Sequence, residues 1–155
     1  MSSTQTRKEI QAINRGIAGI TDAPDEFPVS IPTANLPLAL TYLGPGVTRW
    51  EAHGGTLITR ERTFLVRVYV VDVEQGLGIT DGMEAAEQLL DTFLDTWQKI
   101  GELDNGGDVR ITIEGGRVVG IGIRDSGVVH DMVYAGQTFR GFEAQITIIE
   151  DVEDE

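Results

Sequence analysis

The segment DSGVVH, residues 125–130, carries residue types that occur in two kinds of catalytic site. An Asp-Ser-Gly sequence after an apolar strand is typical of one half of an aspartic protease dyad, in which two carboxylates share one proton. A serine with an aspartate and a histidine close by could also supply the nucleophile, the base and the orienting carboxylate of an acyl-transfer enzyme. The segment therefore raises the question of whether the chain is an enzyme.

Neither catalytic interpretation fits the surrounding sequence. The chain has one DSG, so a protease dyad would need a symmetric dimer, and Arg124 just before Asp125 would hold that carboxylate ionised. Ser126 lacks the strand–turn–helix elbow that presents an acyl-transfer nucleophile. Because Asp, Ser and Gly all form turns, we predict a structural turn between strands at 117–124 and 128–134, and no enzymatic activity.

Few other residues could support chemistry. The glycine-rich segment GLGITDG at 76–82 lacks the lysine of a phosphate-binding loop, and His53 and His130 would need carboxylate partners from elsewhere to bind a metal. The chain has no cysteine, which excludes disulfides, zinc–thiolate sites and thiol nucleophiles. We therefore predict no catalytic, cofactor-binding or metal-binding residues.

Length and charge restrict the remaining classes of function. The 155 residues suit one domain, which we place at residues 1–150, followed by an acidic C-terminal tail at 151–155. The net charge is −13, and Lys99 is the only lysine beyond residue 8, so the sequence argues against specific binding of nucleic acid. Apolar runs are too short to span a membrane and MSSTQTRKEI is unlike a signal peptide, so we expect a soluble protein made in a cytoplasm.

Apolar periodicity predicts two helices. The first, at residues 4–20, has one stripe of isoleucines, and the second, at 81–100, starts with the capping-box-like pair Asp81 and Glu84. Between the first helix and the first strand, a proline-rich segment at 22–37 should cross the domain in an extended form. The stripe residues of the two helices are Ile10, Ile13, Ile17 and Ile20, and then Met83, Ala86, Leu90, Phe93, Leu94, Trp97 and Ile100.

Alternating apolar residues predict the strands, at 36–43, 47–52, 56–73, 128–134 and 137–150, with an additional hairpin at 109–123 turning at Gly115-Gly116. Two of these strands each place four apolar residues on one face, which should meet the second helix: Phe64, Val66, Val68 and Val70, and Phe142, Ala144, Ile146 and Ile148. The predicted fold is α+β, a mainly antiparallel sheet with two helices packed on one face and an extra β-hairpin.

The segments LPLALTYLGPG, RTFLVRVYVVDV and YAGQTFRGFEAQITI, in this order around the two helices, resemble the tail terminator family of long-tailed, lambda-like bacteriophages. The resemblance covers most of residues 5–150, but GGTLITRER and the hairpin at 109–123 depart from the shorter members. It implies a structural virion protein, made in the host bacterial cytoplasm, that caps the head-proximal end of the tail tube. It also implies a homo-oligomeric ring, typically a hexamer, that contacts the major tail tube protein and the head–tail connector and lets DNA pass without specific binding. No cofactor and no membrane are implied.

A ring of subunits needs a sheet surface that is half polar and partly apolar. We expect that surface to include Arg67, Tyr69, Tyr134, Arg140, Glu143 and Gln145. The acidic composition also suits a ring lumen along which DNA phosphates slide. Two alternatives remain: another head–tail connector or neck ring protein, and a monomeric ligand-binding module.

Overall fold

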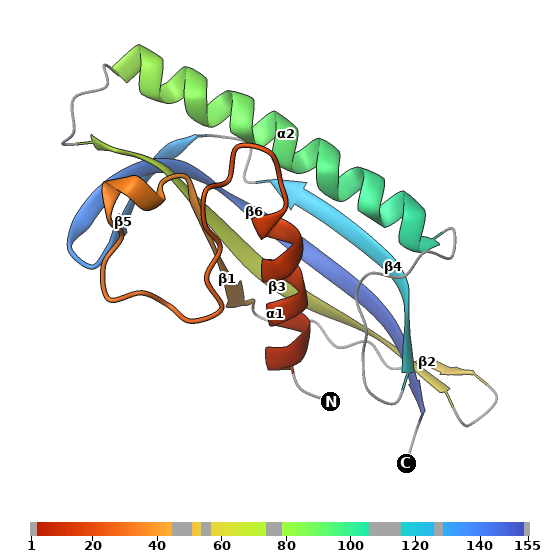
Figure 1. Cartoon of the computed structure of the whole chain (residues 1–155). Helices are drawn as coiled ribbons and strands as arrows, with labels where there is room; N and C mark the ends of the chain where they lie inside the picture. The colour runs from red at the N-terminus through yellow and green to blue at the C-terminus, as the bar shows by residue number, and fades with distance from the viewer. Residues whose placement is uncertain are drawn as a thin grey trace.

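The structure, a computed structural model, describes residues 3–44, 51–53, 57–73, 79–105, 116–125 and 129–153, and has the predicted α+β fold (Figure 1). Over these residues one antiparallel sheet of six strands is covered on one face by two helices. The elements are α1 Ser3–Arg15, the 3-10 turn η1 Thr33–Asn35, β1 Leu38–Leu43, β2 Glu51–His53, β3 Leu57–Asp72, α2 Ile79–Asn105, β4 Gly116–Asp125, β5 His130–Tyr134 and β6 Gln137–Glu153.

Two long strands, β3 and β6, form the centre of the sheet. They pair from Leu57 opposite Glu153 to Asp72 opposite Phe139. The outer edge of β3 carries β1 and β2, and the outer edge of β6 carries β4 and β5. The ends of β3, β6 and β4, together with β2, extend beyond the layer of helices (Figure 1).

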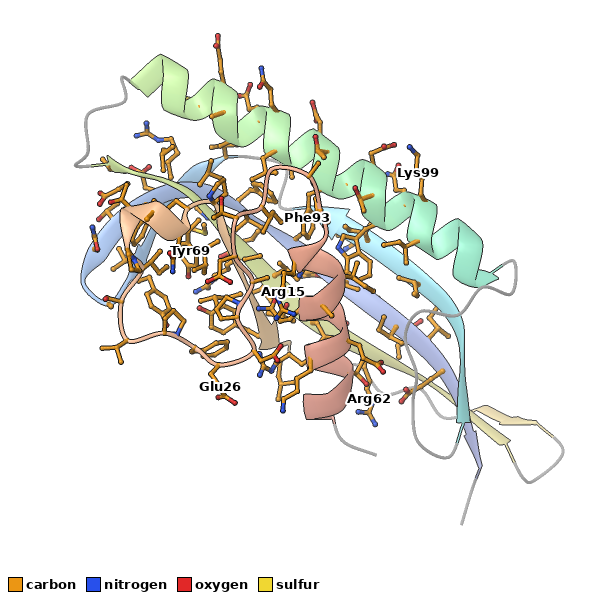
Figure 2. The ribbon with its side chains drawn as sticks, in the orientation of Figure 1. Arg15, Glu26, Arg62, Tyr69, Phe93 and Lys99 are labelled. Atoms are coloured by element: carbon orange, nitrogen blue, oxygen red, sulfur yellow. The ribbon has the colours of Figure 1, made fainter. Side chains whose placement is uncertain are left out.

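The face of the sheet that the helices cover holds the main core. As predicted, the two sets of alternating apolar residues on β3 and β6 are buried there, in contact with the stripe of α2. Figure 2 shows Phe93 between α2 and the sheet, and its ring meets that of Phe142 edge-on at a centroid distance of 5.5 Å. The helix α2 is longer than predicted and continues through Gly101 to Asn105.

The helix α1 is shorter than predicted. It ends at Arg15, and Gly19 follows with a φ of +94°, a conformation that residues with a side chain rarely adopt. Gly16 and Gly19 both disfavour a helical conformation, so the helix ends before them. Ile17 and Ile20 are buried in the main core nonetheless, so the stripe is preserved through a turn instead of a helix.

A network of polar side chains lies inside the main core between α1, β1 and α2. The Trp97 Nε1–H donates to Asn14 Oδ1 at 2.9 Å, and the Thr41 hydroxyl donates to Gln11 Oε1 at 2.7 Å. The Gln11 amide nitrogen in turn donates to the backbone carbonyl oxygens of Pro24, at 2.7 Å, and Ala39, at 3.0 Å. This network fixes α1 against the edge of the sheet, and the isoleucine stripe gave no sign of it.

The opposite face of the sheet has a second, smaller core under the proline-rich segment. Its buried residues are Ile31, Leu38, Leu40, Tyr69, Met132 and Phe139. The segment crosses the domain as predicted, but only Ile31 of its apolar residues between 27 and 31 is buried, since Phe27 is 47% exposed and Val29 is 94% exposed. The remainder of this face is left uncovered by the segment and displays polar side chains.

The two central strands approach so closely at one point that only glycine fits. A Cβ atom on Gly141 would lie 1.9 Å from the backbone oxygen of Val68. Next to it the register shifts between Tyr69 and Val71, which makes Val70 an extra, bulged residue on β3.

The strands on either side of the predicted DSG turn do not pair with each other. Asp125 pairs with Ala144 and His130 pairs with Gly141, so β4 and β5 run in the same direction along one edge of β6. A long strand partner such as β6 accommodates both short strands in line, which the turn-forming residues could not reveal. Ser126, Gly127 and Val128 lie outside the described residues.

The true hairpin turn follows β5, where Ala135 and Gly136 have φ values of +52° and +79° and join it to β6. Of the hairpin predicted at 109–123, the second arm is β4, and residues 109–115 lie outside the described residues. The boundary placed after residue 150 also needs correction, because β6 continues to Glu153 and Asp151 pairs with both Thr59 and Arg117. Pairing on both sides holds the start of the acidic segment in the sheet.

Candidate subunit interface

The structure brings together three of the six residues predicted for the interface. Arg67 and Glu143 are opposite each other on β3 and β6 and form an ion pair, with Nε 2.8 Å from Oε1. Gln145 is exposed two residues further along β6. Because side chains alternate along a strand and the neighbours of these residues are buried under the helices, all three lie on the face opposite the helices.

The other three predicted residues lie elsewhere. Tyr69 is fully buried in the second core, and the ring of Tyr134 packs edge-on against it at a centroid distance of 5.6 Å. The Tyr134 hydroxyl donates to the backbone oxygen of Pro28, so this side chain ties the proline-rich segment to the sheet. Arg140 lies on the helix side, beside Gly82 of α2, and pairs with Asp131 at 3.1 Å. The six residues therefore do not form one patch.

Stacked cationic and aromatic side chains run along the β1 edge of the sheet. The Arg67 guanidinium lies over the ring of Tyr42 at 5.2 Å, Tyr42 meets Phe27 at a centroid distance of 4.8 Å, and the Arg7 guanidinium lies over Phe27 at 5.4 Å. Such contacts are each worth about 0.5–1 kcal/mol at an exposed site. We call these four residues, together with Leu43, the cation–aromatic surface.

A pocket of about 510 Å³ opens in this surface, lined by Arg7, Glu26, Phe27, Tyr42 and Leu43. Two of its walls are well exposed, since Leu43 is 61% exposed and Phe27 is 47% exposed. The Arg7 Nη2 donates to the backbone oxygen of Asp25 at 2.6 Å, whereas its Nη1 is buried and has no hydrogen-bond partner among the described residues. The pocket thus combines apolar walls with one cation, Arg7, and one carboxylate, Glu26.

Burial and neighbouring groups shift the pKa values of three residues in or beside this surface, Arg67, Tyr69 and Tyr134. Burial opposes the charge on Arg67, but the attraction of Glu143 is among the effects that outweigh it, and the pKa of Arg67 is raised overall. Burial raises the pKa of Tyr69, aided by its hydroxyl contact with Tyr42 at 3.3 Å. Burial followed by the nearby Tyr42 raises the pKa of Tyr134. Arg67 therefore remains a cation, and Tyr69 and Tyr134 remain neutral near pH 7.

A second charged feature lies on the outer surface of α2. Glu84, Glu87, Asp91 and Asp95 are all exposed, and their spacing places them in one stripe facing away from the sheet. Asp95 pairs with Lys99 one turn later at 3.0 Å, and both are more than half exposed. We call these four carboxylates the acidic stripe.

The structure places two of the residues that suggested catalysis, Asp125 and His130, along one edge of β6. Asp125 ends β4 and His130 begins β5, opposite β6 residues that lie three positions apart in the sequence, Ala144 and Gly141. Within the described ranges no group of three or more His, Asp or Glu residues could hold a metal ion. In the same part of the chain neither helix is both long and apolar enough to cross a membrane.

Sequence reasoning named Arg67 but missed the rest of the cation–aromatic surface. Phe27 lies in the proline-rich segment that was predicted to cross the domain, which is the one signal that pointed to it. The partnership of Arg7 with Asp25 and Phe27 joins residues 18 or more positions apart, and no local pattern encodes it.

No protein-family model matches the chain, and no curated protein matches it either.

Proposed function

We propose that this chain is a structural protein of a long-tailed bacteriophage that caps the tail tube as a ring. It ends polymerisation of the tube and offers a docking surface to the head connector. The observation that carries the proposal is the order of the elements: the three segments that resemble the tail terminator family fall on β1, β3 and β6, around two helices that share one face of the sheet.

The charge of the chain supports this function. A ring through which DNA moves must not hold phosphates tightly, and a net charge of −13 opposes such binding. The partly exposed Arg67–Glu143 pair and the cation–aromatic surface leave polar and apolar groups at the surface of the subunit. A head-to-tail contact between identical subunits either closes into a ring or continues into a filament, and a cap requires closure.

The test is removal of the gene from the phage that carries it. We expect tails of uncontrolled length, or tails that do not join heads, and restoration of normal particles when the chain is supplied in trans. Normal tails firmly attached to heads in its absence would refute the function.

Another ring of the neck would need the same kind of fold and charge. Electron microscopy of labelled particles separates the two, because a terminator lies on the last ring of the tube and a connector component lies on the head side of it. A monomeric ligand-binding module, in contrast, would remain a single subunit in solution and in the particle fraction.

A further inference from the structure

We propose that the pocket in the cation–aromatic surface is filled by the same surface of a second copy of this chain, in a two-fold dimer of the free protein. The repeated contact of a one-way ring joins two different surfaces, whereas a two-fold contact joins one surface to itself. The inference therefore goes beyond the proposed function and does not rest on it. It starts from the way in which the proline-rich segment presents its apolar side chains.

The proline-rich segment holds two apolar side chains in the solvent beside the pocket. Val29 is 94% exposed, and Phe27, which forms one wall of the pocket, is 47% exposed. The backbone around Val29 is fixed on both sides, because the Tyr134 hydroxyl donates to the Pro28 carbonyl oxygen and Ile31 is buried in the second core. A contact residue whose backbone is fixed in advance loses little conformational freedom on binding. Val29 is thus a preorganised, protruding apolar contact.

A hollow of matching character lies next to this protrusion. The pocket has a volume of about 510 Å³ and three apolar or aromatic walls, Phe27, Tyr42 and Leu43. Val29 is two residues from Phe27, so the protrusion and the hollow belong to one surface. A two-fold axis through this surface brings Val29 of each copy to the pocket of the other copy, and both exposed apolar sites leave the solvent together.

The surface also carries one charge of each sign. Arg7 and Glu26 both line the pocket, and neither forms an ion pair among the residues that the structure describes. The adjacent Asp25 is already paired with Arg15 at 3.2 Å, which leaves Glu26 as the available carboxylate. Arg7 is held by the Asp25 carbonyl oxygen and lies over the Phe27 ring, so it contributes its charge and not a free hydrogen-bond donor.

This pair of charges favours a second copy over a partner of one sign. A purely acidic partner would meet Glu26 and a purely basic partner would meet Arg7, and like charges brought together oppose binding. Two-fold symmetry instead places Glu26 of each copy toward Arg7 of the other, so that an opposite charge is met at both positions. Glu26 lies at the lower margin of the molecule, on the side away from Lys99 of α2 (Figure 2).

Sedimentation equilibrium of the full chain at rising concentration tests the dimer. We expect a reversible monomer–dimer equilibrium, and Val29→Ser should weaken it at least about tenfold, because each dimer loses two buried aliphatic contacts. The matched control is Val133→Ser, which changes another exposed valine, 64% against 94%. Val133 precedes Tyr134 on β5 and therefore points away from the proline-rich segment, so this control should dimerise like the unmodified protein.

Exchange of the two charges tests the two-fold arrangement itself. Glu26→Arg or Arg7→Glu alone should weaken the dimer at least about tenfold, because each change turns two attractive charge pairs into repulsive ones. An equimolar mixture of the two variants should associate again, as heterodimers only, since opposite charges then meet at both positions. Glu84→Arg, which reverses an exposed carboxylate of the acidic stripe on α2, is the control and should leave the dimer unchanged.

Three outcomes overturn the inference. The first is a protein that stays monomeric at every concentration, and the second is a dimer that neither Val29→Ser nor Glu26→Arg weakens. The third is a mixture of Glu26→Arg and Arg7→Glu that does not associate although circular dichroism shows both variants to be folded. All three leave the proposed function standing, because that function fails only if tails are normal without the chain.

Discussion

The two faces of the sheet differ in how completely other segments of the chain bury their side chains. On the helix side, side chains of β3 and β6 are buried beneath α1 and α2, and even the polar groups Gln11, Asn14 and Thr41 are satisfied internally. On the opposite side, a proline-rich segment closes only a small core, and the Arg67–Glu143 pair remains partly exposed beside it. The same two strands supply both faces, because successive side chains point in opposite directions.

This difference indicates which residues stabilise the fold and which are available for the proposed assembly. The helix side has no unused contact capacity to offer a partner at Phe93, Trp97 or Ile146, since each of these is buried almost completely. The opposite side and the β1 edge keep aromatic and charged groups at the surface. Substitutions should therefore separate into those that unfold the protein and those that affect association alone.

The largest effect should come from Phe93→Ala on the helix side. Emptying a buried aromatic site costs about 3–5 kcal/mol of the free energy of unfolding, and Phe93 also loses its edge-on contact with Phe142. Urea unfolding followed by circular dichroism measures the change. The matched control is Phe27→Ala on the other side, 47% exposed, which should cost less than about 1 kcal/mol. Similar losses in the two variants would refute the contrast between the faces.

A smaller loss should follow Asn14→Leu within the buried network. The substitution leaves the Trp97 Nε1–H without its acceptor in a closed core, which should cost about 1–3 kcal/mol. The same urea titration detects it, and Thr92→Ala on the exposed surface of α2 serves as the control, with an expected change within about 0.5 kcal/mol. A stability equal to that of the unmodified protein would mean that water enters and replaces the amide.

Alkaline pH should weaken the second core selectively. The fold keeps Tyr69 neutral by raising its pKa, whereas the unfolded chain ionises this residue near pH 10. The stabilising preference for the neutral form is complete below that pH and is lost as pH rises through the range above it, by about 1.4 kcal/mol per pH unit for one group. Stability of the unmodified protein should thus fall above about pH 10, and Tyr69→Phe should reduce the slope, leaving the part due to Tyr134.

Denaturation curves at several alkaline pH values measure this slope. Identical slopes for the unmodified protein and Tyr69→Phe would show that Tyr69 ionises as readily in the folded protein as in the unfolded chain. That result would contradict the buried position of Tyr69 in the second core.

The sequence predicted those parts of the fold that depend on local periodicity. Alternation identified the strands around Phe64–Val70 and Phe142–Ile148, and the helical spacing of Phe93 and Trp97 identified α2, because each pattern is repeated within one element. Three features were not predicted: the early end of α1, the in-line arrangement of β4 and β5, and the pairing of Asp151. Each depends on which other element lies beside the segment. The spacing of apolar residues within a segment carries no information about its neighbours.

The candidate interface was predictable only in part for the same reason. Arg67, Glu143 and Gln145 were found because alternation alone places them on the uncovered face. Tyr69 is on that face too, but the ring of Tyr134 packs against it and the Tyr134 hydroxyl holds the proline-rich segment, which requires a contact between residues as distant as Pro28 and Tyr134. Arg7 enters the pocket from α1, for which the sequence predicted a role of the isoleucine stripe alone.

The smallest effect should come from Asp125→Asn, at the end of the edge strand β4. Asp125 is the last residue of β4, opposite Ala144, and its role as a backbone partner in the ladder does not depend on the carboxylate. We expect a change in stability of at most about 1 kcal/mol, and normal tails when the variant replaces the unmodified chain in the phage. A peptide-cleavage assay tests whether Asp125 has a catalytic role instead. If the purified protein cleaves a peptide and Asp125→Asn abolishes the cleavage, the chain is an enzyme. We expect no such activity, because β4 and β5 place Asp125 and His130 opposite Ala144 and Gly141, at successive positions along one edge of the sheet.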